Sequence, residues 1–375
     1  MKILLVGNII GASRSQLLIQ KLIIFQTDKN YTISICGTDF YAKAESYNKK
    51  VLTKIHKFFF LIELFIKIGF SDVIYIMAMN HHFIKPVLLC NRFWKKKILT
   101  DLYISAYDTG LDRGFFKNDT PKSRKLKERY ISYDKLILEK SNIIIHLTKG
   151  ELDYIAELVN ADLDYSKVRI VPLGIDERIG AQPTQSTTFR MGWWGTWIPL
   201  HGIENILKAV KYLSDTQVNV KLDLYGAEGD DKDFYINYIK ELGISDYATA
   251  HTDKSFANGK LETELLYRCD LALGNFGNSK KAEHVITNKI IDAMSMKLPV
   301  LTMKNKVLHE FIDEKNDLFV CSNNPVDIAK IILEIINNPQ ESKRRANNGY
   351  NCYKTHFTPQ LYTDKVISII ESIIK

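Results

Sequence analysis

Short apolar runs that alternate with helical patterns are the feature that most constrains the fold of this chain. A first set of runs, each typical of a buried strand, occupies residues 2–7, 31–36, 73–77, 97–100, 143–147 and 168–172. The pattern then starts again, with runs at residues 190–194, 221–225, 248–251, 271–274, 300–302 and 318–320. Because strands that alternate with helices form parallel sheets covered on both faces, we predict an α/β protein with two doubly wound parallel sheets.

The stretch between the two sets is typical of a linker. Residues 179–188 (IGAQPTQSTT) are small and polar and include a proline. A chain of 375 residues is also too long for one ordinary core. We therefore predict a first domain over residues 1–178 and a second over residues 189–358. Wound domains of this kind bind ligands at the carboxyl ends of their strands.

Composition limits the class of protein. Five cysteines stand far apart without metal-ligand or redox spacing, which favours a reducing compartment and no disulfide framework. The first apolar run is short and lacks a small-residue cleavage site, so we interpret it as a strand and not as a signal peptide. No uncharged apolar run reaches about 18 residues, so we expect no membrane span and a cytoplasmic protein.

Charge is distributed unevenly along the chain. Residues 1–150 hold 25 Lys and Arg against 12 Asp and Glu, whereas the remaining residues hold 26 against 31. A basic half suggests a partner that is anionic, either nucleic acid or a membrane surface. The sequence contains no nucleic-acid recognition motif, and attraction to phosphate applies equally to lipid headgroups. We therefore expect an anionic membrane surface and no nucleic acid.

Two segments of the basic half combine basic with aromatic side chains, as a headgroup interface requires. Residues 51–70 bring together Lys54, Lys57, Lys67, Phe58, Phe59, Phe60 and Phe65. Residues 113–129 hold seven basic residues beside Phe115 and Phe116. The alternative is that the first segment is a helix covering the core and the second a solvated loop.

Several polar residues of the first half follow predicted strands, where a parallel sheet presents side chains to a ligand. They are Asn8, Gly11, Asn80, His81, His82, Asp101, Tyr103, Asp108, Thr148 and Lys149. The adjacent histidines favour contact with a sugar or a phosphate, and the alternative is a structural hydrogen-bonding role. The first loop lacks the G-x-G-x-x-G fingerprint, and no acidic residue ends the second strand, which argues against a nicotinamide-dependent dehydrogenase.

A glycine-containing turn opens the second half. Residues 195–202 (GTWIPLHG) follow a strand and precede a helix. Gly195 and Gly202 permit close approach of the backbone to a ligand, and His201 stands just before the helix. Many strand–turn–helix junctions look alike, so this turn becomes informative only together with the next segment.

Residues 287–302 read as a short helix, a tight turn and a buried strand. Thr287 is expected to cap the helix with its hydroxyl. Lys289 and Asp292 stand three residues apart and so share one face of the helix. The free amides and Lys289 would hold phosphate, and Asp292 would accept hydrogen bonds from ribose hydroxyls. The alternative is an ordinary helix–strand unit with surface charges.

Together these residues resemble bacterial glycosyltransferases of the GT-B fold, family four, the retaining transferases of cell-surface polysaccharide synthesis. The stretches that carry the resemblance are Val168–Asp176, Gly195–Gly202, Leu222–Gly226 and Thr287–Thr302. The resemblance implies two Rossmann-like domains facing across a cleft, with the acceptor bound by the first and the nucleotide sugar by the second. It also implies that a final helix, residues 359–375, crosses back to the first domain.

The resemblance implies roles for individual residues. The second of the family's paired glutamates is Asp292 here, while His284, with Glu283 beside it, stands at the first position. Thr196 replaces an arginine and His201 a lysine, and Lys289 would supply the missing cation. The expected donor-binding set is Gly11, Gly195, Thr196, His201, Glu283, His284, Thr287, Asn288, Lys289 and Asp292, and the expected catalytic set is His81, His82 and Asp101.

The resemblance further implies that no metal or cofactor is needed. The departing diphosphate would deprotonate the acceptor, while protein groups stabilise charge on the leaving phosphate. Asp231 and Asp233 resemble a metal-binding D-x-D only superficially, and an acid-rich helix start is the better interpretation. We expect a lipid-linked or oligosaccharide acceptor at the inner face of the membrane. The alternatives are a sugar-nucleotide epimerase of the same fold and a non-catalytic protein that binds nucleotide sugar or glycan.

Overall fold

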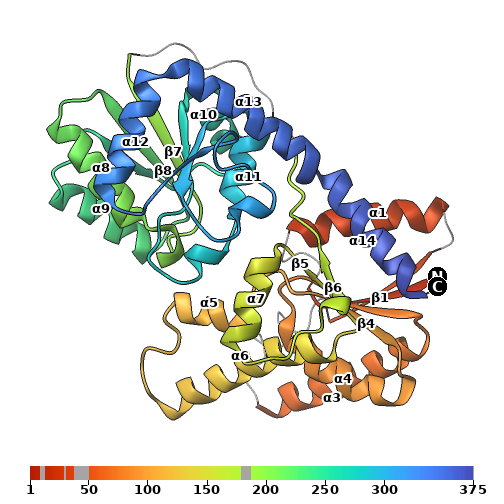
Figure 1. The fold of residues 1–375 in the computed structure, drawn as a ribbon. Coiled ribbons are helices and arrows are strands. Elements are labelled where there is room, and N and C mark those ends of the chain that lie inside the picture. Colours follow the sequence, from red (N-terminus) through yellow and green to blue (C-terminus); the bar gives the residue numbers. More distant parts are fainter. Residues whose placement is uncertain (9–12, 29–30, 38–49, 179–186, 375) are drawn as a thin grey trace. The chain divides into compact units, whose positions relative to one another are not determined.

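The computed structural model describes residues 1–375 except 9–12, 29–30, 38–49, 179–186 and 375. The chain folds as two compact units, and each is described here by itself (Figure 1). Unit 1 comprises Met1–Gly174 together with Pro359–Lys375, and unit 2 comprises Ile175–Thr358. Each unit contains one six-stranded sheet whose neighbouring strands are all parallel, which confirms the predicted α/β class with two parallel sheets.

The sheet of unit 1 has the strand order β2-β1-β3-β4-β5-β6. The strands are β1 (Lys2–Val6), β2 (Thr32–Cys36), β3 (Val73–Ile76), β4 (Lys97–Asp101), β5 (Ile143–His146) and β6 (Val168–Ile170). The helices are α1 (Ser13–Asp28), α3 (Lys50–Gly69), α4 (Ile84–Trp94), α5 (Ala106–Asp112), α6 (Pro121–Lys140), α7 (Lys149–Leu158) and α14 (Pro359–Ile374), with short 3-10 turns η1 (His81–Phe83) and η2 (Tyr165–Lys167). Every run predicted in this half forms a strand.

The two faces of this sheet bury different side chains, because successive residues of a strand point to opposite faces. Leu4 and Val6 of β1 belong to a core shared with α3, α4, α6 and α7. Ile3 and Leu5 belong to a second core shared with α1 and α14. The last helix therefore packs on unit 1 beside α1 (Figure 1). Burial of each such aliphatic side chain contributes about 1.5–3 kcal/mol.

The sheet of unit 2 has the strand order β12-β11-β10-β7-β8-β9. The strands are β7 (Phe189–Trp194), β8 (Val220–Tyr225), β9 (Ala248–His251), β10 (Leu271–Leu273), β11 (Val300–Met303) and β12 (Phe319–Cys321). The helices are α8 (Ile203–Asp215), α9 (Asp230–Glu241), α10 (Lys260–Arg268), α11 (Asn288–Ser295), α12 (Pro325–Asn337) and α13 (Pro339–His356), with 3-10 turns η3 (Pro199–His201), η4 (Ala282–His284) and η5 (Leu308–Glu310). Asp231 and Asp233 lie in the first turn of α9, where the sequence predicts an acid-rich helix start.

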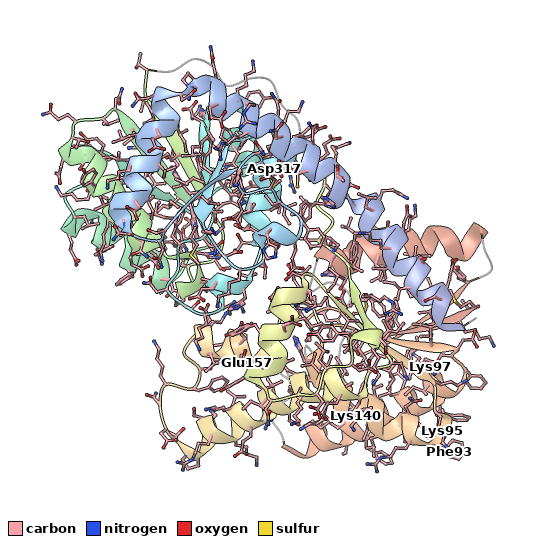
Figure 2. All side chains as sticks on the ribbon, in the orientation of Figure 1. Phe93, Lys95, Lys97, Lys140, Glu157 and Asp317 are labelled. Carbon is pink, nitrogen blue, oxygen red and sulfur yellow. The ribbon has the colours of Figure 1, made fainter. Side chains whose placement is uncertain are left out.

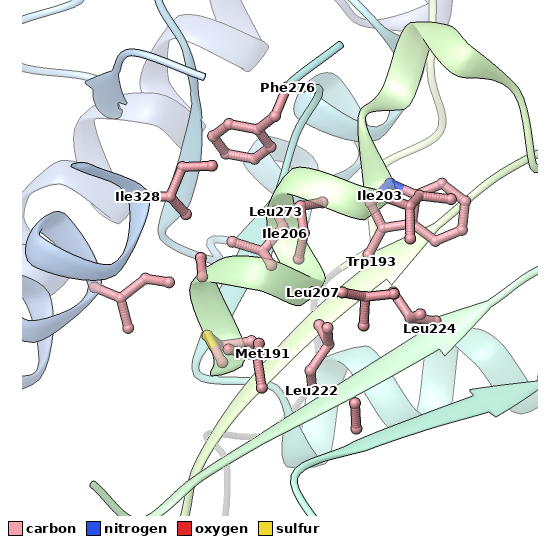
Figure 3. Packing of buried hydrophobic residues seen from close by; sticks show 14 of the residues in the cluster. Met191, Trp193, Ile203, Ile206, Leu207, Leu222, Leu224, Leu273, Phe276 and Ile328 are labelled. Carbon is pink, nitrogen blue, oxygen red and sulfur yellow. The ribbon is translucent and has the colours of Figure 1, made fainter. Parts of the chain in front are cut away.

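The core of unit 2 orients the end of β7. Trp193 is completely buried, and it packs with Leu224 of β8 and with Ile203 and Leu207 of α8 (Figure 3). The apolar residues of α8 recur at helical spacing, so that one face of the helix lies on the sheet. Because α8 is anchored in this way, the turn that joins β7 to it has a defined position at the carboxyl end of the strand.

Candidate functional site

The turn between β7 and α8 depends on two glycines. Gly195 has φ +147°, and Gly202 has φ +60° in the left-handed region. A Cβ at Gly202 would lie 2.2 Å from the backbone carbonyl carbon of Phe276, so only glycine fits there. The carbonyl of His201 accepts a hydrogen bond from the Phe276 amide at 3.0 Å, which ties the turn to the loop after β10.

Two basic side chains meet beside this turn. Lys289, in the first turn of α11, has its Nζ 2.8 Å from Nδ1 of His201, and both side chains are buried. The Lys289 Nζ also lies 4.5 Å from the ring centroid of Trp193, within range of a cation–π interaction. A Cβ at Gly195 would lie 3.5 Å from Lys289 Nζ and 3.6 Å from His201 Nε2. Both nitrogens therefore border the space that residue 195 leaves open.

The environment of this pair opposes positive charge. Burial lowers the pKa of Lys289 well below its ordinary value, and Asp292 offsets only part of this effect. Burial also lowers the pKa of His201 well below its ordinary value, and the charges of Lys289 and Lys281 lower it further. Among the described residues, no carboxylate forms an ion pair with Lys289. An anion placed beside Gly195 would therefore meet two hydrogen-bond donors that form no ion pair with a described carboxylate.

Asp292 lies one turn further along α11 and is also buried. Its Oδ1 accepts a hydrogen bond from Arg178 Nη1 at 2.9 Å, and its Oδ2 accepts one from Trp194 Nε1 at 3.3 Å. The Arg178 guanidinium lies 4.3 Å from the ring centroid of Phe256. Burial raises the pKa of Asp292, and Arg178 opposes the rise. A carboxylate has about four acceptor positions, so a diol can still hydrogen-bond to Asp292 beside its protein donors.

The predicted cap of α11 is wrong in one respect. Thr287 is the N-cap residue by backbone conformation, but its hydroxyl makes no hydrogen bond to the helix. It donates instead to Oδ1 of Asn275 at 3.4 Å. Asn275 is fully buried after β10, so it offers an acceptor that the sequence around Thr287 does not reveal. The backbone carbonyl of Thr287 still accepts from the Ile290 amide at 3.0 Å.

The other residues predicted to bind the donor have varied surroundings. Thr196 and Asn288 are exposed at the turn and at the start of α11. Glu283 forms a 3.1 Å ion pair with Lys306, and His284 Nδ1 lies 2.8 Å from the Lys280 carbonyl oxygen. Gly11 lies outside the described residues. The roles of all of these residues in binding remain predictions.

Sequence reasoning missed four residues of this site. Arg178 and Trp194 hold Asp292, Trp193 faces Lys289, and Lys281 is a buried cation that acts on His201. The two tryptophans end a strand, and bulky aromatics directly before a glycine turn were a usable signal. Nothing in the local sequence distinguishes Arg178 or Lys281 from a solvated basic residue.

The residues predicted on the acceptor side lie in unit 1. Asp101, the last residue of β4, is fully buried and forms a 3.0 Å ion pair with Arg14 Nε. It also accepts a hydrogen bond from the Tyr75 hydroxyl at 3.2 Å. Asp101 therefore has a structural partner, and its predicted catalytic role stays a prediction.

His81 and His82 form the start of η1, which follows the loop after β3. His81 Nε2 hydrogen-bonds to the carbonyl oxygen of Ile104, so this nitrogen carries the hydrogen and Nδ1 is left as an acceptor. Burial, together with His81, lowers the pKa of His82 to about 4. His82 is therefore neutral at physiological pH, and His81 is the better candidate for contact with a ligand.

Comparison with known proteins identifies the region that contains this site. Residues 192–352 match the protein family described as glycosyl transferases group 1. The match includes β7, the glycine turn, Lys289 and Asp292. Most of unit 2 is thus similar to glycosyl transferases group 1. A comparison with curated proteins gives no match.

Solved structures resemble the whole chain. HepE from Anabaena, in complex with UDP-glucose, has a TM-score of 0.69 at 14% identity, with 99% of this chain and 100% of HepE covered. Sucrose-phosphate synthase from Thermosynechococcus elongatus has a TM-score of 0.71 at 11% identity, with 100% and 99% covered. The lipopolysaccharide outer core galactosyltransferase WaaB has a TM-score of 0.63 at 11% identity, with 99% of each chain covered. At these identities the likeness shows the fold, which is GT-B.

Proposed function

We propose that this chain, which has the GT-B fold and is similar to glycosyl transferases group 1 over most of unit 2, transfers a sugar from a nucleotide-sugar donor to a glycan acceptor. One observation carries the proposal. Within the matched residues, a buried carboxylate and two buried basic groups lie on and beside one helix, next to a glycine at which a Cβ would lie within 3.6 Å of both basic nitrogens. A nucleoside diphosphate presents a diol and a diphosphate, and these are the groups that such a carboxylate and such donors bind.

The donor is assigned to individual side chains. Asp292 accepts hydrogen bonds from two adjacent ribose hydroxyls, as its two oxygens allow. Lys289 and His201 bind the diphosphate together with backbone amides near Gly195. Asp292 is one methylene shorter than the family's usual glutamate, so α11 has to approach the ribose slightly more closely. Each charge-assisted hydrogen bond would contribute about 1.5–3 kcal/mol.

The proposal includes retention of the sugar's configuration and no metal ion. Support comes from the hydrogen-bond donors assigned to the phosphate position, because Lys289 and His201 would stabilise there the leaving diphosphate that a metal-dependent enzyme stabilises with its cation. The leaving diphosphate would accept the proton of the acceptor hydroxyl. No strong protein base is then required, and the protein contributes mainly by stabilising charge on the leaving group.

A lipid-linked acceptor in surface polysaccharide synthesis is the second part of the proposal. Its support is a surface of unit 1, here called the aromatic patch, formed by α3 and α4. The exposed large apolar residues of the patch are Ile55, Phe58, Phe59, Ile62, Phe65, Ile66, Phe70, Leu89 and Phe93. Phe58 and Phe93 have 60% and 70% of their surface exposed, which is unusual for clustered aromatic residues.

Basic residues border the aromatic patch. Lys57, Arg92, Lys95 and Lys97 are exposed on or next to α3 and α4, and Figure 2 labels Phe93 and Lys95 at the end of α4. Anionic headgroups would attract these charges while the rings enter the interface. Phe60 is an exception to the predicted set, since it is buried against Phe83 at a ring distance of 5.5 Å. Among the described residues, no helix is long and apolar enough to span a bilayer.

The second basic segment has a different character. Its seven basic residues are exposed, two of them between α5 and α6 and five in the first half of α6. Phe116, however, packs between Tyr107 and Tyr130, at ring distances of 5.7 and 5.9 Å. Only Phe115 remains exposed there. This segment therefore supplies charge to the proposed membrane surface but little apolar area.

A thermal-shift screen with UDP-, GDP-, ADP- and TDP-sugars tests the donor assignment. A ligand that binds only the folded state raises the melting temperature, by an amount that grows with its concentration over Kd. UDP-glucose is the first choice because HepE binds it in a similar fold. A subsequent assay of donor hydrolysis or transfer separates an enzyme from a protein that only binds the donor. If no nucleotide sugar shifts the melting temperature, the proposed function is wrong.

A further inference from the structure

The contact between Lys289 and His201 defines which imidazole nitrogen carries a hydrogen. Lys289 Nζ lies 2.8 Å from His201 Nδ1. An ammonium group is a donor only, so the nitrogen that faces it has to accept. In a neutral imidazole the hydrogen then resides on Nε2, which is the nitrogen that borders the open space at Gly195.

Neighbouring groups support a charged Lys289 beside a neutral His201. The Trp193 ring lies 4.5 Å from Lys289 Nζ, and an aromatic face attracts an ammonium more than an amine. Burial lowers the pKa of Lys289, and Asp292, on the same helix, offsets part of this effect. Lys281, just before η4, adds positive potential at His201 and so disfavours a second proton on the ring. Arg178 pairs with Asp292, so that this carboxylate does not serve His201.

We propose that Lys289 is a positioning residue that holds His201 as a neutral imidazole with its hydrogen on Nε2, directed to the donor's phosphate. His201 then donates a neutral hydrogen bond and acts neither as a base nor as a cation. The inference rests on the proposed function, because it specifies how the same site meets the diphosphate. It differs from a simple pair of cations, in which both side chains would be charged.

Nuclear magnetic resonance of the full-length chain with nitrogen-labelled histidine tests the tautomer. The His201 signals are identified by their loss in His201→Gln. We expect Nε2 protonated and Nδ1 unprotonated, with no titration between about pH 5.5 and 8.5. In Lys289→Met the pKa of the ring should rise, although burial still holds it below its ordinary value, and both tautomers should be present. Lys281→Met is the matched control, because it removes a nearby buried lysine but keeps the contact at Nδ1.

Two results would overturn the inference. One is a wild-type His201 with its hydrogen on Nδ1, and the other is a wild-type His201 that titrates near 6.5. Both results are read from the wild-type spectrum once His201→Gln has identified the signals, so neither depends on whether Lys289→Met or Lys281→Met folds.

Calorimetry with UDP, GDP, ADP and TDP separates this inference from the proposed function. If none of them binds, the proposed function fails while the tautomer result stands. If one binds, His201→Gln should weaken it by about 2- to 12-fold, the range for one neutral hydrogen bond. This loss should be equal at pH 6 and pH 8, roughly either side of the ordinary histidine pKa. A loss that grows as the pH falls would show that an imidazolium binds the phosphate, and the inference would be wrong.

Discussion

Units 1 and 2 both bury charged side chains near the ends of strands, but they neutralise them differently. In unit 1, Arg14 and Asp101 form a 3.0 Å ion pair that is almost completely buried. The hydroxyl of Tyr362 accepts from Arg14 Nε at 3.4 Å, and the rings of Tyr103 and Tyr362 lie near the guanidinium. Burial would lower the pKa of Arg14, but Asp101 and the tyrosines outweigh this effect and raise it. In unit 2, by contrast, the Nζ of Lys289 lies beside another basic group, the imidazole of His201.

The difference between these two contacts indicates different roles, one in folding and one in ligand binding. A buried ion pair of opposite charges connects elements, and here it links α1, β4 and α14 of one unit through Arg14 Nε, while both Nη atoms of Arg14 and Oδ1 of Asp101 have no hydrogen-bond partner among the described residues. Burial disfavours positive charge on Lys289 and His201, and Asp292 offsets only part of this effect on Lys289, so an anion bound beside them would stabilise the charge of Lys289. The comparison therefore assigns the Arg14 network to folding and the Lys289 pair to binding.

The largest expected effect concerns the Arg14 network. Arg14→Met should lower the free energy of unfolding of unit 1 by about 3–5 kcal/mol, because Asp101 is left as a buried charge without a cation. Urea denaturation with hydrogen exchange resolved for each unit measures the loss. The double variant Arg14→Met, Asp101→Leu should recover most of it, since both charges are gone. A single variant as stable as the wild type would contradict the structural assignment.

The next effect tests whether unit 1 takes part in transfer. His81→Ala should lower the transfer rate by about 100-fold, the lower range for a positioned proton donor or acceptor. Calorimetry should show unchanged nucleotide binding, because the nucleotide is assigned to unit 2. His309→Ala, a change of an exposed histidine in unit 2, is the control. If both His81→Ala and His82→Ala transfer sugar at the wild-type rate, neither histidine is catalytic.

Asp292→Asn tests the ribose contact in unit 2. The change keeps the shape but replaces an acceptor with a donor, and it removes the charge that faces Arg178. We expect nucleotide affinity to fall by about 10- to 150-fold, equivalent to about 1.5–3 kcal/mol, with the protein still folded. Asp231→Asn at the start of α9 is the matched control. Calorimetry that finds wild-type affinity in Asp292→Asn would show that the ribose binds elsewhere.

The pH dependence of donor binding tests whether Lys289 gains a proton when the diphosphate binds. In the free protein, burial lowers the pKa of Lys289. A bound diphosphate favours the protonated amine and raises that pKa, so the complex holds more protons than the free protein. Affinity for UDP-glucose should therefore fall as the pH rises between the two pKa values, by up to about tenfold per pH unit. Calorimetry in buffers of different ionisation enthalpy measures the proton uptake, and Lys289→Met should abolish it at about pH 8.5, where His201 is neutral in the variant as well.

The smallest effect concerns the surface of unit 1. Each basic residue near an anionic membrane contributes about 1 kcal/mol, so Arg92→Gln should weaken vesicle binding by about fivefold. Phe93→Ser should weaken binding to a similar extent through loss of apolar area. Phe234→Ser, at an exposed phenylalanine of unit 2, is the control. Co-sedimentation should depend on anionic lipid and fall with salt, and equal binding to neutral vesicles would refute the electrostatic part.

The sequence by itself determined the strands, the α/β class and the family resemblance. Apolar runs of strand length, separated by helical patterns and turn residues, specify these features locally, because burial on both faces of a parallel sheet requires continuous apolar residues. It also selected Lys289 and Asp292, since their spacing on one helix places them on the same face.

Only the tertiary structure decided what these side chains meet. Lys289 and His201 stand 88 residues apart, and Arg178 and Asp292 stand 114 apart. Such pairs come together when separate strands align in a sheet, and no local pattern encodes that alignment. For the same reason, Thr287 bonds to Asn275 instead of capping its helix, and Asp101 pairs with Arg14. Burial then sets the charge of each group, because the cost of a charge depends on the atoms that replace water around it.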